Sequence, residues 1–165
     1  MFKQRLTKEQ ALPKIKQYCA YQERCHQEVK DKLYSFGLYK NDVELLISQL
    51  IEENYLNEER FASQFAGGKF RIKQWGRKKI VYALKEKNVS SYCIKLGLKE
   101  IDETDYEKVL HNVAAQKWKA LKGEQYLVRE AKTRNFLLQR GFENEWITKA
   151  IRLIKADAES NHPKK

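Results

Sequence analysis

A threefold internal repeat constrains the fold of this chain more than any other feature of its sequence. Three segments align without gaps over eighteen columns when Leu33, Leu84 and Leu137 are superposed. Four positions after each anchor stands a residue type that tolerates the left-handed backbone conformation with which many helices end: Gly37, Asn88 and Gly141. Each anchor segment is therefore predicted to be a helix that ends at the same place.

A second helix is predicted after each of these ends. A hydrophobic residue that can fold back onto the finished helix comes first: Leu38, Val89 and Phe142. Next comes the i, i+4, i+7 aliphatic pattern of an amphipathic helix: Val43, Ile47 and Leu50; Ile94, Leu98 and Ile101; Ile147, Ile151 and Ile154. Candidate N-caps stand just before these patterns: Asn41 with Glu44, Ser90 or Ser91, and Asn144.

A third helix is predicted in the first two repeats. In the first repeat it begins near Asn57, and in the second a capping box of Thr104 and Glu107 starts it. The residues that these two helices are expected to bury are Phe61, Ala62, Phe65 and Ala66, and Val109, Leu110, Val113 and Trp118. The third repeat has no room for such a helix, while an extra helix capped by Thr7 and Gln10 opens the chain.

These patterns predict an all-α fold, an elongated array of tandem three-helix, homeodomain-like repeats with an N-terminal helix. The predicted boundaries are an N-terminal helix over 1–22, repeat 1 over 23–72, repeat 2 over 73–121, a truncated repeat 3 over 122–157 and a polar tail over 158–165. Arrays of this kind offer a long surface along which another macromolecule can lie.

The charge balance limits the partners that this chain is expected to bind. Its 33 Lys and Arg residues outnumber 22 Asp and Glu residues, which leaves a formal charge of +11 and favours polyanions or an acidic protein surface. No stretch approaches the roughly 20 apolar residues that cross a bilayer, so we expect no membrane partner and a cytoplasmic location. An odd number of cysteines, Cys19, Cys25 and Cys93, predicts buried thiols rather than a disulfide framework.

Two clusters of basic residues are the candidate contact sites. The denser one is interrupted by an aromatic ring and contains Lys69, Arg71, Lys73, Trp75, Arg77, Lys78 and Lys79. Cations at this density can neutralise phosphates, and an exposed indole can stack on an unpaired base. The alternative is an ordinary basic surface in which Trp75 is a core anchor. The second cluster contains Arg129, Lys132, Arg134 and Arg140, and nearby glutamates are alternative partners for it.

Catalytic and cofactor motifs are missing from the sequence. The glycines near Trp75 do not form a phosphate-binding loop, and the histidines His26, His111 and His162 are scattered. No serine or cysteine lies in a nucleophile elbow, and Cys25 and His26 lack the further ligands that a zinc site needs. We therefore predict a protein that is not an enzyme and that uses no cofactor or metal.

Several runs of residues resemble the bacterial RecX family. They are the run from Tyr55 to Phe65 (YLNEERFASQF), Gly76, the helix end from Leu84 to Val89, and the run from Arg134 to Phe142 (RNFLLQRGF). The segment from Arg24 to Leu33 resembles the family's first repeat, and the resemblance extends over roughly residues 10–155. The chain departs from the family pattern in two places. The family usually has an Asp in the position of Glu58 or Glu59, and its central helix is often less lysine-rich than the run from Arg77 to Lys79.

The resemblance implies a modulator of the RecA recombinase, made of three tandem three-helix repeats. Such a protein lodges in the groove of the RecA filament on DNA and restrains its recombinase, ATPase and co-protease activities in DNA repair and the SOS response. The expected partners are the RecA filament and, weakly and without sequence preference, single- or double-stranded DNA, with the protein itself a monomer. Two alternatives stay open, a stand-alone helix-turn-helix-like transcriptional regulator and a scaffold for an acidic protein.

Overall fold

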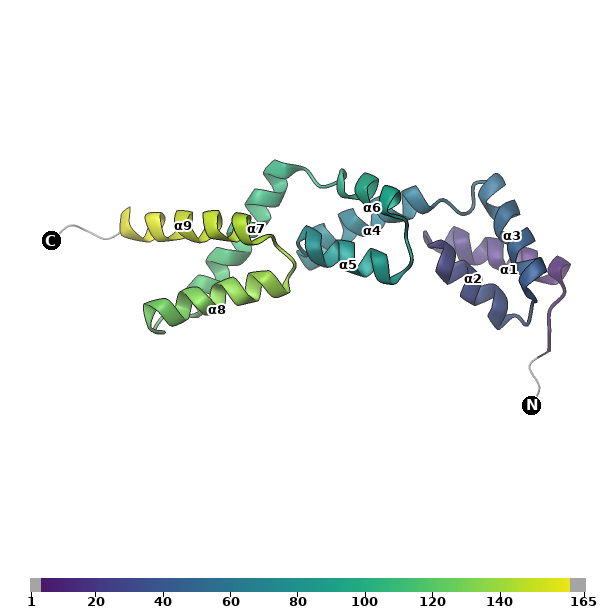
Figure 1. The fold of residues 1–165 in the computed structure, drawn as a ribbon, viewed down its shortest axis with the longest axis horizontal. Helices are drawn as coiled ribbons and strands as arrows, with labels where there is room; N and C mark the ends of the chain where they lie inside the picture. The colour runs from purple at the N-terminus through teal and green to yellow at the C-terminus, as the bar shows by residue number, and fades with distance from the viewer. Residues whose placement is uncertain (1–3, 161–165) are drawn as a thin grey trace. The chain divides into compact units, whose positions relative to one another are not determined.

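Residues 4–160 of the chain are described by a computed structural model. Residues 1–3 of the predicted N-terminal segment and residues 161–165 of the predicted polar tail, with His162, lie outside the described residues. Over the described range the chain forms nine α-helices and no strand, which confirms the predicted all-α class (Figure 1). The helices are α1 (Lys8–Tyr21), α2 (His26–Ser35), α3 (Lys40–Glu52), α4 (Glu58–Lys73), α5 (Arg77–Glu86), α6 (Ser91–Leu98), α7 (Glu103–Ala120), α8 (Tyr126–Gln139) and α9 (Asn144–Ser160).

The chain divides into two compact units, and the division runs through α4 and α5. Unit 1 consists of Met1–Phe65 and Ala83–Leu98, and unit 2 of Ala66–Tyr82 and Lys99–Lys165. Unit 1 therefore holds α1, α2, α3 and α6 with one part of α4 and α5, and unit 2 holds α7, α8 and α9 with the other part. Each unit is described by itself below.

The core of unit 1 lies where α1, α2 and α3 pack against one another. These helices bury one apolar stripe each, as the 3.6-residue period predicts. The buried cluster consists of Ala11, Ile15, Cys19, Val29, Leu33, Leu38, Val43, Leu46, Leu50 and Leu56. Burying an aliphatic side chain of this size stabilises a fold by about 1.5 to 3 kcal/mol, so this stripe is what holds the three helices together.

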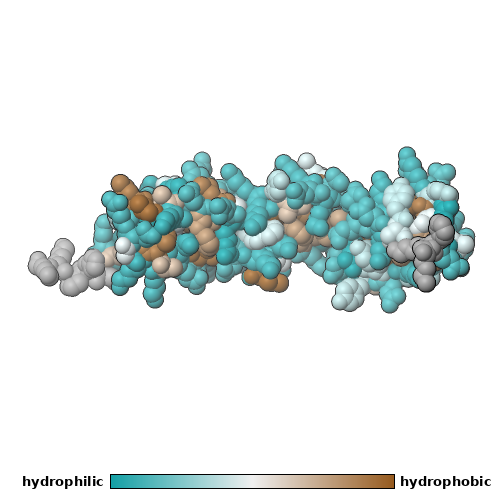
Figure 2. Space-filling model, turned by 90° about the horizontal axis from the view of Figure 1, so that it is seen from below, coloured by the Kyte–Doolittle hydropathy of each residue, from teal (hydrophilic) through white to brown (hydrophobic). Residues whose placement is uncertain are grey.

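The core of unit 2 lies between α7 and the pair formed by α8 and α9. Tyr106 and Leu110 from α7 meet Leu137 from α8 and Ile147 and Ile151 from α9, and all five side chains are buried. The polar residues are on the outside, and most of the surface seen in Figure 2 is hydrophilic. Three helices with one buried stripe each form a small bundle.

The predicted helix ends are confirmed at all three repeat anchors. Gly37, Asn88 and Gly141 have positive φ angles of 86°, 59° and 94°. After two of them the chain folds back with the hydrogen bonds of a Schellman motif, from Val89 N to Leu84 O at 3.1 Å and from Phe142 N to Leu137 O at 3.2 Å. The hydrophobic residue that follows each end, Leu38, Val89 or Phe142, is buried as predicted.

Three of the predicted helix starts are also confirmed. Thr7 and Gln10 form the capping box of α1. The Asn57 side chain accepts a hydrogen bond from the Arg60 N–H at 2.9 Å at the start of α4, and the Ser90 hydroxyl accepts one from the Cys93 N–H at 3.2 Å at the start of α6. In each case a short polar side chain satisfies a backbone donor that the first turn leaves unpaired.

Three predicted N-caps are wrong. Asn144 is the first residue of α9 rather than its N-cap, and the Glu143 carbonyl before it accepts a hydrogen bond from the Ile147 N–H at 3.0 Å. Tyr39, not Asn41, is the N-cap of α3, because the chain needs only one extended residue after the turn at Gly37 and Leu38 before the helix begins. Asp102, not Thr104, caps α7 by accepting a hydrogen bond from the Asp105 N–H at 3.0 Å. An aspartate at this place supplies both the acceptor and a negative charge favourable to the helix dipole.

Burial agrees with the predicted apolar pattern in most positions. The exceptions are Ile47, Phe65, Leu98 and Val109, which are half-buried. Ile101 is buried but lies beyond the end of α6 at Leu98. The three cysteines are buried free thiols, as predicted. Burial raises the pKa of Cys19 and of Cys25 to about 11. None of the described helices is long and apolar enough to cross a bilayer.

The helices can be grouped into threes in more than one way. The contacts group α1 with α2 and α3, and α7 with α8 and α9. The boundaries predicted from the repeat group α2 with α3 and α4, and α5 with α6 and α7, and leave α8 and α9 as a truncated unit. A tandem repeat has no unique starting point. The two groupings therefore describe the same series of helices and differ only in the helix with which each group of three begins. The predicted boundaries stay a prediction.

Candidate nucleic-acid and partner-protein interface

The densest basic stretch of the sequence forms the connection from α4 to α5, within unit 2. Gln74 has a positive φ of 55° and ends α4, which turns Trp75 back toward the helix. The Trp75 ring is half-buried, with Lys69 Nζ 5.0 Å and Lys79 Nζ 4.5 Å from its centroid. Cation–π attraction favours ammonium groups this close to an indole ring, so Trp75 helps to keep two positive charges at this surface.

The start of α5 is attached to the end of α8 through backbone hydrogen bonds. The Gly76 N–H donates to the Arg140 carbonyl at 2.7 Å, and the Lys78 N–H donates to the Gly141 carbonyl at 2.9 Å. The Arg77 N–H between them donates to the Tyr106 hydroxyl at 3.1 Å. Donors that the first turn of α5 leaves unpaired thus meet acceptors that the last turn of α8 leaves unpaired. These N–H groups are therefore not available to hold an anion.

Glycine is required on both sides of this attachment. A Cβ atom added to Gly76 would lie closer than 3.0 Å to the backbone of Gly141 and Phe142. A Cβ atom added to Gly141 would lie equally close to Lys79, and the positive φ of Gly141 disfavours any side chain. The two backbones can approach this closely only because both positions lack a side chain.

The attachment brings the two predicted basic clusters together at one depression in the surface of unit 2. It is lined by Lys73, Trp75, Lys79, Phe136, Gln139 and Arg140. Arg140 donates from Nη1 to the Lys73 carbonyl at 3.0 Å, and its guanidinium lies 5.0 Å from the Phe136 ring. A basic side chain that donates a hydrogen bond to one of the last carbonyls of a helix pairs that acceptor and also interacts favourably with the helix dipole. We call this depression the Trp75 hollow.

Arg77 faces the interior of unit 2. Its guanidinium lies 4.0 Å from the Tyr106 ring and 4.8 Å from the Trp146 ring. Arg77 Nε faces Glu143 Oε1 at 3.8 Å as an ion pair, and the Tyr106 hydroxyl donates to the same carboxylate. Burial is the largest cause that raises the pKa of Tyr106 above its ordinary value, so this hydroxyl stays protonated. The structure therefore uses Arg77 to join α5 to α7 and α9.

Most of the second basic cluster also makes contacts inside unit 2. Arg129 donates from Nε to the Trp118 carbonyl at 2.8 Å and lies 4.1 Å from the Trp118 ring. Lys132 forms an ion pair with Glu124 at 2.6 Å. Arg134 donates from Nη1 to Asn144 Oδ1 at 2.7 Å and to the Thr148 hydroxyl at 2.9 Å. Of this cluster, only Arg140 lines the Trp75 hollow.

Four members of the predicted site are exposed, Arg71, Lys73, Lys78 and Lys132, and of these Lys132 is paired with Glu124. The sequence interpretation did not single out Phe136, Gln139 or Ile72, although Ile72 is 80% exposed beside these cations. Phe136 could have been found from its position, because it stands four residues before Arg140 and so shares a helix face with it.

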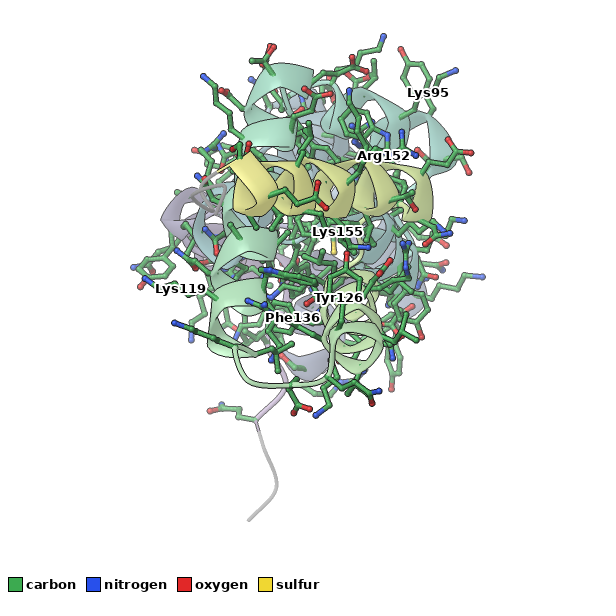
Figure 3. All side chains as sticks on the ribbon, turned by 90° about the vertical axis from the view of Figure 1, so that its left-hand side faces the viewer. Lys95, Lys119, Tyr126, Phe136, Arg152 and Lys155 are labelled. Atoms are coloured by element: carbon green, nitrogen blue, oxygen red, sulfur yellow. The ribbon has the colours of Figure 1, made fainter. Side chains whose placement is uncertain are left out.

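An apolar start of α8 was also missed. Tyr126, Leu127 and Val128 are exposed, and Figure 3 shows Tyr126 beside α9 near Lys155. The Lys155 ammonium lies 4.8 Å from the Tyr126 ring and also pairs with Glu130 at 2.5 Å. In the part of the chain that the structure describes, no group of three or more His, Cys, Asp or Glu side chains is placed to hold a metal ion.

Comparison with known proteins identifies the family. Residues 57–98 match the family model described as RecX, second three-helix domain, and residues 104–151 match the model described as RecX, third three-helix domain. Together these segments cover more than half of the sequence. The chain belongs to the RecX family. Within RecX, the matched segments correspond to α4, α5 and α6 and to α7, α8 and α9.

Relatives named Regulatory protein RecX extend the similarity over most of the chain. The RecX protein of Pelodictyon phaeoclathratiforme is 32% identical over 127 residues, which are 77% of this chain and 78% of the relative. That of Clostridium perfringens (strain 13 / Type A) is 30% identical over 134 residues, and the match spans only 62% of its length. The chain is thus similar to regulatory proteins by sequence.

A solved RecX structure shows the same fold. The crystal structure of RecX from Lactobacillus salivarius matches with a TM-score of 0.84 over 90% of this chain and 97% of that chain, at 20% sequence identity. The tandem three-helix fold predicted from the repeat is therefore confirmed by both the family models and this likeness.

Proposed function

We propose that this RecX-family protein is a cytoplasmic, non-enzymatic regulator of RecA that binds the RecA filament on DNA and restrains its recombinase, ATPase and co-protease activities. Membership of the RecX family supports the regulatory role, and the resemblance that the sequence carries supplies RecA as the partner. The observation that carries the proposed mode of binding is the set of cations gathered at and beside the Trp75 hollow.

The chemistry of the Trp75 hollow suits a phosphate-rich partner. Lys73, Lys79 and Arg140 line it, and Arg71 and Lys78 are exposed next to them in the sequence. No acidic side chain is among the described residues that line the hollow. Cations in such a group attract DNA phosphates by releasing condensed counterions, which gives affinity without sequence preference and makes it fall steeply with salt.

The proposal gives the site residues two different roles. Arg71, Lys73 and Lys78 contact the filament, with Lys69 and Lys79 beside them at Trp75. Arg77, Arg129, Lys132 and Arg134 hold unit 2 together, and Arg140 does both. A protein held in this way across neighbouring RecA protomers would hinder subunit addition, ATP turnover and access of the repressor to the filament.

Charge reversal at the exposed cations tests this proposal. In the triple variant Arg71→Glu, Lys73→Glu, Lys78→Glu, inhibition of RecA ATPase on single-stranded DNA is expected to require at least tenfold more protein, because three charges are reversed in sign at one surface. The matched control is Lys99→Glu, Lys108→Glu, Arg152→Glu, which changes the net charge equally at exposed positions elsewhere in unit 2. Equal inhibition by the two triple variants would remove the Trp75 hollow from the mechanism.

Binding to DNA without RecA separates the proposal from a stand-alone transcriptional regulator. We expect weak binding to DNA that does not depend on the DNA sequence and whose affinity falls as the salt concentration rises. A sequence-specific regulator would instead discriminate by about 1 to 3 kcal/mol for each mismatched base pair. A competition titration with unrelated duplexes of equal length distinguishes the two.

A further inference from the structure

A second depression lined by cations and aromatic rings lies in unit 1, whereas the basic stretch that dominates the sequence belongs to unit 2. It is formed by the outer side of α1, the connection to α2 and the end of α2. Its main lining residues are Lys14, Tyr18, Tyr21, Arg24, Lys32 and Phe36. We call it the Tyr18 hollow. None of the described residues that line it is acidic.

The cations of the Tyr18 hollow are held in place by aromatic faces. The Arg24 guanidinium lies 3.8 Å from the Tyr18 ring, and its Nε donates to the Tyr18 carbonyl at 3.2 Å. The Lys32 ammonium lies 5.4 Å from the Tyr18 ring and 5.7 Å from the Phe36 ring. Glu28 lies 3.9 Å from Arg24, and no ion pair among the described residues involves Lys14 or Lys32. The hollow therefore has a net positive charge, and two of its three cations are held by aromatic rings.

The ring of Tyr21, which lines this hollow, is exposed and accessible to a ligand. Tyr21, the last residue of α1, is 83% exposed. A tyrosine this exposed contributes little to the core, yet its ring has the shape on which an unstacked nucleic-acid base can lie. Lys14 is exposed as well and comes from the same helix.

The Tyr18 hollow and the Trp75 hollow are similar in chemistry although different segments of the chain form them. Each has one half-buried ring with two cations near its centroid, Arg24 and Lys32 at Tyr18, and Lys69 and Lys79 at Trp75. Each also has a phenylalanine in its lining, Phe36 or Phe136. The basic stretch makes the Trp75 hollow visible in the sequence, whereas the residues of the Tyr18 hollow are scattered over 14–36.

We propose that unit 1 carries a second nucleic-acid-binding surface at the Tyr18 hollow, and that its ligand is single-stranded nucleic acid. Lys14, Arg24 and Lys32 contact the phosphates, and the Tyr21 ring stacks on a base. A single strand fits better than a duplex, because bases in a duplex are already stacked and paired and offer no face to Tyr21. The surface acts on the strand directly, so the proposal does not depend on RecA regulation.

Binding of a fluorescent oligo-dT strand, followed by anisotropy without RecA, tests the electrostatic part. Lys14→Glu, Lys32→Glu is expected to weaken binding at least tenfold and to lower the slope of log affinity against log salt by about 1.4, since each lost phosphate contact on a single strand accounts for about 0.7. The matched control Lys85→Glu, Lys95→Glu changes the net charge equally at exposed positions of unit 1 and is expected to weaken binding no more than about threefold. Lys95, labelled in Figure 3, lies on α6. Equal weakening by the two pairs overturns the proposal.

The stacking part is tested by Tyr21→Ala, with Tyr92→Ala as its control, because Tyr92 is also exposed and lies in unit 1. Tyr21→Ala is expected to weaken oligo-dT binding about fivefold or more, with an unchanged salt slope, and Tyr92→Ala by less than twofold. Poly-glutamate is the second probe. If it competes as well as unlabelled oligo-dT at equal charge and Tyr21→Ala has no effect, the hollow is a site for acidic protein and the proposal fails. Should Lys14→Glu, Lys32→Glu lose its helical circular dichroism, the pair Lys14→Gln, Lys32→Gln gives the same test.

Discussion

Each unit contains a seam where helices from neighbouring groups of three meet, and the two seams are built from different chemistry. The seam of unit 1 is polar. Arg60 pairs with Glu23, His26 Nδ1 faces Glu58 at 3.4 Å, and Asn88 Nδ2 donates to Gln27 Oε1 at 3.1 Å. The seam of unit 2 consists mainly of aromatic rings and a close contact between two glycines, with the Arg77 to Glu143 ion pair at 3.8 Å beside the rings. Tyr106 lies 5.8, 5.4 and 5.2 Å from the rings of Phe70, Phe142 and Trp146, beside the contact of Gly76 with Gly141.

The difference between the two seams indicates that the seam of unit 2 is the more rigid one. A polar seam can exchange its hydrogen bonds for bonds to water at little net cost, whereas a close-packed aromatic seam has no comparable substitute when its shape is altered. The Trp75 hollow adjoins the aromatic seam, since Trp75 and Arg140 in its lining are the chain neighbours of Gly76 and Gly141. Its cations are therefore fixed by packing rather than by surface ion pairs, which salt would weaken.

The largest effect is expected at the glycine contact. Gly76→Val should destabilise unit 2 by about 3 kcal/mol or more, because the added side chain overlaps backbone that cannot move without breaking the bonds from Gly76 and Lys78 to α8. Chemical denaturation followed by circular dichroism measures this. Gly68→Ala is the matched control, since a Cβ there meets nothing within 4 Å and lies inside α4. It should be neutral or stabilising by up to about 1 kcal/mol. Equal stability of both variants would show that the glycine contact is not tight.

A smaller effect is expected from Tyr106→Phe. The ring stays, so aromatic packing is kept, but the hydroxyl that accepts from the Arg77 N–H and donates to Glu143 is lost. The Arg77 N–H is left without its partner in a partly buried place and Glu143 keeps only its ion pair with Arg77, which should destabilise unit 2 by about 1 to 3 kcal/mol. Tyr92→Phe on the surface is expected to change stability by less than about 0.5 kcal/mol. If the two variants unfold alike, the aromatic rings alone hold the seam.

The sequence predicted the fold well because the residues that end a helix recur at the same place in each repeat. Gly37, Asn88 and Gly141 each mark a helix end by a local backbone requirement, and a local requirement can be read one residue at a time. Helix starts were less certain. Asp102 caps α7 in place of Thr104, because several short polar side chains compete at the start of that helix. Tyr39 is the N-cap of α3 in place of Asn41 without a side-chain hydrogen bond, which no side-chain preference predicts.

The candidate site was harder to predict than the fold. The sequence showed which residues are basic, but it could not show that Arg77 lies against Tyr106 or that Arg134 donates to Asn144. Those contacts join residues ten to about thirty positions apart, so they follow from tertiary packing. The Tyr18 hollow was missed for the same reason, since two helices and their connection supply its charges. Local charge density is a useful guide only where one segment supplies the whole site.

In the polar seam, the pairing of Arg60 with Glu23 is expected to contribute about 1 kcal/mol. Arg60 also donates to the Asn54 carbonyl at 3.1 Å, and both charged side chains are partly shielded from water. A double-mutant cycle with Arg60→Ala and Glu23→Gln measures the coupling. The exposed pair Lys40 and Glu44 is the matched comparison and should couple by less than about 0.5 kcal/mol. Coupling at Arg60 no larger than at Lys40 would mean that the polar seam is held by its apolar surroundings alone.

All three cysteines belong to unit 1, so thiol labelling reports on that unit. Burial raises the pKa of Cys25 to about 11, two units above its ordinary value of 9.0, which alone should slow labelling at pH 8 about a hundredfold. Arg60→Ala is expected to speed the labelling of Cys25 because it loosens the seam nearby, whereas Gly76→Val should leave it unchanged. Faster labelling in Gly76→Val would show that the two seams are coupled.

The smallest effect is expected at the exposed link between α1 and α3. Lys16 Nζ lies 2.9 Å from Glu53 Oε2, and the hydrogen bond from Lys16 is the main cause that lowers the pKa of Glu53 below 4.5. A lowered carboxyl pKa gives stability that is present above pH 4.5 and is lost as the pH falls through the folded-state pKa. Carbon-13 titration of Glu53 should show its pKa rise toward 4.5 in Lys16→Met, while Lys14→Met, on the same helix, leaves it unchanged. Because this pair is open to water, 1 M salt should produce most of the same rise in the wild-type protein. If the pKa of Glu53 changes neither in the variant nor in 1 M salt, the hydrogen bond from Lys16 to Glu53 does not form in solution.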